Sequence, residues 1–91
     1  MINLKVITPH GLIWDGEVAS VNLKTTSGEI TVLPNHIPLV STLEKGMVKI
    51  VSEGKKLRAE IAGGVLEVKR GSHIVIITTE ASKFLEEDKL E

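Results

Sequence analysis

The sequence predicts an all-β fold, an antiparallel β-sandwich with a short carboxy-terminal helical or frayed tail. Three observations support this: apolar residues recur at every second position, polar or glycine turns follow at intervals of about eight to twelve residues, and the core must be aliphatic. Hydrophobic residues make up 42% of the 91 residues, and aromatic residues only 2%. A core of valine, isoleucine, leucine and alanine favours strands over helices.

The first strand is expected over residues 2–6, where isoleucine, leucine and valine alternate with polar residues, and Pro9 and Gly11 close it. A second apolar segment at residues 12–14 precedes a predicted turn at residues 15–16. These signals predict two short strands before the more specific part of the chain.

Val21 and Leu23 alternate with polar residues and predict a third strand that ends at Gly28. Residues 27–46, SGEITVLPNHIPLVSTLEKG, then combine a glycine turn, a short apolar strand and a corner bracketed by Pro34 and Pro38. Each proline holds its own φ at about −65° and steers the preceding residue away from helical geometry. We therefore expect a rigid, exposed corner that carries His36.

Two hairpins are predicted in the second half of the chain, residues 47–61 around Gly54 and residues 65–77 around Gly71. Residues 74–77 are hydrophobic at both odd and even positions. Such a strand is buried on both sides, either within its own domain or on one side by a partner. The periodicity leaves both interpretations open.

The period changes to a helical one only at residues 80–91, EASKFLEEDKLE, where Ala81, Phe84 and Leu85 fall on one side. One or two helical turns are expected there. We therefore divide the chain into a β-sandwich domain at residues 1–80 and, at residues 81–91, a tail or the start of a truncated carboxy-terminal helix.

The composition argues against several classes of function. The chain lacks cysteine, and His10, His36 and His73 fit no ligand spacing, so no metal site is expected. No nucleophile elbow, P-loop or dinucleotide fingerprint occurs, so neither catalytic residues nor a cofactor are expected. With 11 basic and 12 acidic residues the charge is balanced, which makes nucleic acid an improbable partner. No apolar run is long enough for direct membrane insertion, and the amino terminus lacks a targeting signal, so we expect a soluble cytoplasmic chain.

Residues 27–46 are followed by AGGVLEV at residues 62–68 and by VIITTEA at residues 75–81. This order of motifs resembles the amino-terminal domain of the epsilon subunit of the F-type ATP synthase. The resemblance runs from about residue 4 to residue 81. It implies a β-sandwich at the foot of the central rotor stalk, bound to the gamma subunit on one face and to the c ring at its lower edge.

The resemblance also implies which residues touch partners. Ser27, Gly28 and Glu29 match the acidic turn that faces the c ring in the family, and His36 matches a corner histidine that lies against gamma. Positions near the gamma-facing sheet are matched by Val40, Ser41 and Met47. Without the resemblance, Glu29 and His36 would be interpreted as ordinary solvated turn residues.

Members of this family usually continue into two carboxy-terminal helices that inhibit ATP hydrolysis. We expect those helices to be largely absent here, which leaves a non-catalytic rotor component of a proton-translocating ATP synthase. It would couple the c ring to gamma at the cytoplasmic face of a bacterial membrane. The alternative is a small β-sandwich that binds a ligand or another protein.

Overall fold

A computed structural model describes residues 1–87 of the chain and consists of ten β-strands joined by short connections. Within this range, no helix has the length and apolar character needed to cross a bilayer. In chain order the strands are β1 (Ile2–Thr8), β2 (Gly11–Val18), β3 (Ser20–Thr25), β4 (Gly28–Val32), β5 (Leu39–Leu43), β6 (Gly46–Ser52), β7 (Lys55–Ile61), β8 (Gly64–Lys69), β9 (His73–Ile77) and β10 (Leu85–Glu86).

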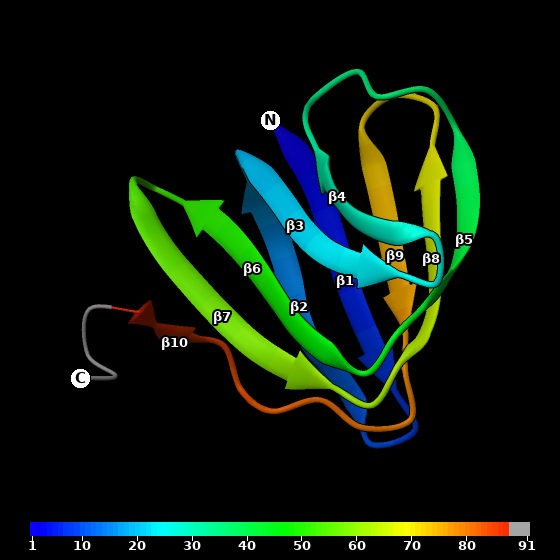
Figure 1. Ribbon diagram of the computed structural model, residues 1–91. Helices are drawn as coiled ribbons and strands as arrows, with labels where there is room; N and C mark the ends of the chain where they lie inside the picture. Colours follow the sequence, from blue (N-terminus) through cyan, green and yellow to red (C-terminus); the bar gives the residue numbers. More distant parts are fainter. Residues whose placement is uncertain (88–91) are drawn as a thin grey trace.

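The strands form one continuous sheet that folds over itself into two layers (Figure 1). The β6 layer contains β10, β7, β6, β3 and β4, and the β8 layer contains β5, β8, β9, β1 and β2. Between β3 and β5 the sheet is continuous through a single residue pair, Thr25 with Leu43. In Figure 1, β3 and β6 cross in front of β1 and β2, which gives the predicted sandwich.

The core lies between the two layers and is aliphatic, as the composition predicts. Inward-facing side chains alternate with outward-facing ones along almost every strand, and burying each one contributes about 1.5–3 kcal/mol. The residues with the least exposure, at most 1%, come from both layers: Ile2, Leu4, Val6, Val18, Val21, Leu23, Val32, Val48, Ile50, Leu66, Ile74 and Ile76.

Both predicted hairpins are confirmed, since β6 pairs with β7 and β8 pairs with β9 in antiparallel register. Another pairing departs from the antiparallel expectation, because β1 lies parallel to β9. These two strands are far apart in the chain, so no tight turn dictates their relative direction.

The predicted turn at Asp15 and Gly16 is wrong, because β2 continues through both residues, which pair with Lys5 and Leu4 of β1. Gly16 lies inside the strand and does not turn the chain. A β-carbon on Gly16 would lie 3.7 Å from Nε1 of Trp14, an ordinary van der Waals contact, so the strand does not require glycine there. The end of the first strand is predicted correctly, since the chain turns between Thr8 and Gly11.

The predicted helical turns are also wrong for the described part of the carboxy-terminal segment, residues 80–87. Ala81 forms a bridge with Ile61, and β10 pairs with β7 in antiparallel register. Pairing with the exposed edge of β7 outweighs the local helical periodicity. The rest of the predicted tail, residues 88–91, lies outside the described residues, and the division at residue 80 stays a prediction.

Candidate partner-binding surfaces

The predicted turn of Ser27, Gly28 and Glu29 joins β3 to β4, and all three residues are exposed. Gly28 has a φ of 125°, which side chains of L residues rarely adopt. Glu29 pairs with Lys24 of β3 on the outer face of the β6 layer. The turn therefore presents its carboxylate to solvent.

Thr25 holds this turn in place from the inside of the sandwich. Its Oγ1 accepts a hydrogen bond from the Ser27 N–H at 3.1 Å and donates one to the Gly28 carbonyl at 2.8 Å. Thr8 makes the same pair of hydrogen bonds in the turn between β1 and β2. Both turns have the pattern Thr-x-x-Gly, a signal visible in the sequence that identifies Thr25 as a positioning residue absent from the predicted set.

His36 lies in the exposed corner between β4 and β5. Its N–H donates to the carbonyl oxygen three residues earlier at 3.2 Å, and Asn35 has a φ of 67°, which fits a type II turn with Pro34 at its second position. The Asn35 N–H donates to Ser72 Oγ at 2.9 Å and ties the corner to the β8–β9 turn. The imidazole is half-buried, and its Nδ1 lies 2.7 Å from the Ile37 carbonyl oxygen, to which the Nδ1–H tautomer donates.

The other predicted contact residues do not share one surface. Val40 is 69% exposed on the outer face of β5, whereas Ser41 is half-buried and its position in the strand alternates to the inner side. Met47 lies on β6, next to the fully buried Val48, and so faces outward from the other layer. The structure therefore separates Val40 from Met47, and a single flat partner surface does not reach both.

One end of the outer face of the β8 layer carries a row of apolar side chains, a feature that the sequence indicated only at residues 74–77, whereas Lys5, Glu67 and His73 lie farther along the same face. In the strand register Val65 lies opposite Ile77, Ile77 opposite Ile7, and Ile7 opposite Leu12. Exposure reaches 43% for Val65, 54% for Ile77 and 55% for Leu12. We call this row, together with Val40 at the position on β5 diagonal to Val65, the apolar outer face. No second layer within residues 1–87 covers it, so the side of β9 opposite the core is free.

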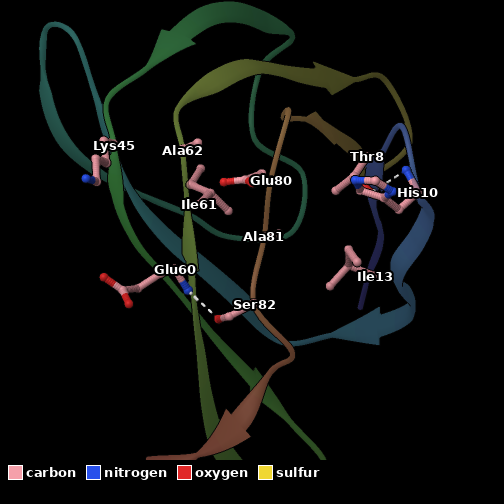
Figure 2. A pocket seen from close by; sticks show the side chains of 10 residues that line it. All are labelled: Thr8, His10, Ile13, Lys45, Glu60, Ile61, Ala62, Glu80, Ala81 and Ser82. Carbon is pink, nitrogen blue, oxygen red and sulfur yellow. Dashed lines mark hydrogen bonds between the residues drawn. The ribbon is translucent and has the colours of Figure 1, made fainter.

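A hollow of about 560 Å³ lies between the β1–β2 turn and residues 80–82 (Figure 2). The hydroxyl groups that line it are already hydrogen-bonded within the chain. Thr8 Oγ1 donates to the Gly11 carbonyl, and Ser82 Oγ accepts a hydrogen bond from the Glu60 N–H at 2.9 Å. His10 and Lys45 line the hollow but are exposed. Within residues 1–87, no cluster of side chains suited to a metal ion occurs.

Comparison with known proteins agrees with this geometry. Residues 1–84 match the family described as ATP synthase, Delta/Epsilon chain, beta-sandwich domain. The chain belongs to this family. The ATP synthase epsilon chain of Bacillus licheniformis is 30% identical over 90 residues, which cover 97% of this chain and 68% of that protein. The chloroplastic epsilon chain of Calycanthus floridus var. glaucus is 38% identical over 82 residues, 90% of this chain and 61% of the relative.

Two solved structures contain chains that superpose on this member of the delta/epsilon family. A chain in the cryo-EM structure of the Euglena gracilis mitochondrial ATP synthase, OSCP/F1/c-ring in rotational state 1, superposes with a TM-score of 0.84 and 29% identity. The superposition covers 99% of this chain and 56% of that one. A chain of the Tetrahymena thermophila central stalk and c-ring structure shares the fold, with a TM-score of 0.75 and 14% identity. The resemblance seen in the sequence is thus confirmed, and the chain spans about three fifths of the chloroplastic relatives' length.

Proposed function

We propose that this chain is a non-catalytic rotor component of a proton-translocating F-type ATP synthase and couples the c ring to the gamma subunit. The apolar outer face carries the proposal. Adjacent exposed valine, isoleucine and leucine side chains on one sheet face are typical of a surface that a partner covers. Family membership supports gamma as that partner and the exposed turn at residues 27–29 as the contact to the c ring.

The alternative, a ligand-binding module, receives no comparable support, because the polar groups of the hollow in Figure 2 are exposed or bonded within the fold. The bacterial relative supports a position at the cytoplasmic face of a bacterial membrane, held there through the complex. His36, Val40, Ser41 and Met47 stay predicted gamma contacts, with Val40 the best placed because it belongs to the apolar outer face.

Gamma binding tests the proposal directly. The double variant Val65→Asn, Ile77→Asn should lower the affinity for purified gamma at least about tenfold, since burying one such side chain contributes about 1.5–3 kcal/mol. Leu85→Asn is the matched control, because Leu85 is 52% exposed on β10 in the other layer. Calorimetric titration of each folded variant measures the effect. Unchanged affinity in the double variant would contradict the proposal.

A further inference from the structure

The outer face of the β6 layer differs from the apolar outer face because it is charged, with four basic side chains beside the carboxylates of Glu29 and Glu60. Lys24 on β3, Lys49 on β6, and Lys56 and Arg58 on β7 alternate with inward-facing neighbours and so point outward. We call these four residues the basic face. The side chain of Asn22 on the same face donates to Thr31 Oγ1 at 2.8 Å, which agrees with this orientation.

Two charges of the basic face oppose each other directly. Lys49 and Arg58 are cross-strand partners, and Lys56 is the diagonal neighbour of Lys49. Like charges in directly opposite positions destabilise a sheet. Among residues 1–87, one ion pair has an N–O distance within 4.0 Å, and it joins Lys55 to Glu86 at 3.5 Å. Neither Lys49 nor Arg58 forms such a pair, so in the described part of the chain no carboxylate is within ion-pair distance of either residue.

A hollow of about 240 Å³ lies beside the opposed pair and is lined by Asn22, Lys49, Lys56 and Glu87, among others. The lysines are exposed, so their ammonium groups are accessible to a binding partner. Glu87 brings a carboxylate from the carboxy-terminal segment to the rim of the same hollow. One carboxylate thus faces two lysines in this hollow, which leaves an excess of positive charge beside the opposed pair.

We propose that the basic face binds an acidic segment of a neighbouring protein, whose carboxylates lie between Lys49, Lys56 and Arg58. Binding would replace a like-charge repulsion with complementary pairs, which gives specificity and a fast association rate. The face lacks the aromatic side chains on which nucleic-acid bases stack. Glu29 and Glu60 on the same layer reduce its net charge below that of a polybasic lipid-binding patch. The proposal does not depend on the apolar outer face, which lies on the other layer.

Titration of the full chain with a decaglutamate peptide at low salt tests this assignment. The unmodified chain should bind the peptide, and Lys49→Glu, Arg58→Glu should weaken binding at least about tenfold. The double variant Lys69→Glu, Arg70→Glu changes the net charge equally at the exposed end of β8 and should stay within about twofold of the unmodified chain. Absence of peptide binding, or an equal loss in both double variants, overturns the proposal.

The single variant Lys49→Glu separates binding from folding. It converts the repulsive pair with Arg58 into an attractive one, so the melting temperature should rise by about 2–6 °C while peptide affinity falls. A purely structural role for Lys49 predicts that both change in the same direction. An unchanged or lower melting temperature overturns the proposal. The proposal is also overturned if the chain binds phosphatidylglycerol vesicles or a single-stranded DNA oligonucleotide more strongly than the peptide, and Lys49→Glu abolishes that binding.

Discussion

At the scale of single residues, Gly64 has the tightest environment of the glycines at the sheet connections. A β-carbon built on it would lie 2.0 Å from the carbonyl oxygen of Ile77, and its φ is 142°. The backbone of β8 therefore approaches β9 at a distance that only glycine permits. This approach also places Val65 beside Ile77 on the apolar outer face.

Gly64→Ala should cost about 3 kcal/mol or more, because both the backbone conformation and the missing space oppose a methyl group. Gly54→Ala is the control, since Gly54 also has a positive φ, of 76°, but has no atom within 4 Å of the new β-carbon. That control should cost about 1 kcal/mol. Thermal unfolding measures the loss of stability in both variants. Equal melting temperatures would show that the backbone near Ile77 shifts without cost to accommodate the methyl group.

At the scale of elements, the carboxy-terminal segment closes an edge that the other strands leave open. The Ser82 N–H donates to the Glu60 carbonyl at 2.9 Å, which extends the pairing of β7 beyond β10. The ring of Phe84 lies 5.4 Å from that of Trp14 on β2, at 64°, and joins the two layers across this edge. Trp14 Nε1 has no hydrogen-bond acceptor within residues 1–87, so apolar contact positions the indole.

Phe84→Ala should therefore loosen the segment and cost about 2 kcal/mol through lost burial and the lost aromatic contact. Phe84→Leu retains most of the apolar area and should cost less than about 1 kcal/mol. Trp14 is the sole tryptophan of the chain, so its fluorescence reports the change directly. We expect a red-shifted emission in Phe84→Ala alone; identical spectra in both variants would rule out the segment as the cover of Trp14.

At the scale of the whole molecule, the folded sheet presents surfaces of different chemistry on its two layers. The apolar outer face belongs to the β8 layer, whereas Glu29 and the basic face belong to the β6 layer. The proposed coupling of two partners needs separate contact surfaces, which the two layers would provide. Contacts to the c ring and to gamma should then be separable by mutation.

Glu29→Lys should weaken attachment to the c ring without changing the affinity for gamma. The substitution places a second positive charge opposite Lys24, which costs at most about 1 kcal/mol on an exposed sheet face. Glu44→Lys, at another exposed carboxylate, is the control for net charge. Co-sedimentation with c-ring vesicles measures attachment. A fall in melting temperature that accounts for the whole loss of attachment would identify Glu29 as a structural residue.

Much of the fold could be predicted because hairpins depend on neighbouring residues. Residues 47–61 and 65–77 contain both the alternation of their strands and the turn between them, so local chemistry specifies each hairpin. The turn at Ser27 to Glu29 was equally predictable. Gly16 was misinterpreted because a glycine inside a strand has the same appearance in a sequence as one that turns the chain.

By itself, the sequence determined the aliphatic core, the two hairpins, the proline corner and the family resemblance, since these depend on residue type and short spacing. Only the tertiary structure decided the parallel pairing of β1 with β9, the extended carboxy-terminal segment and the division of outward side chains between an apolar and a basic face. These features join residues distant in the chain. Their energies come from edge pairing and cross-strand neighbours, which local periodicity does not encode.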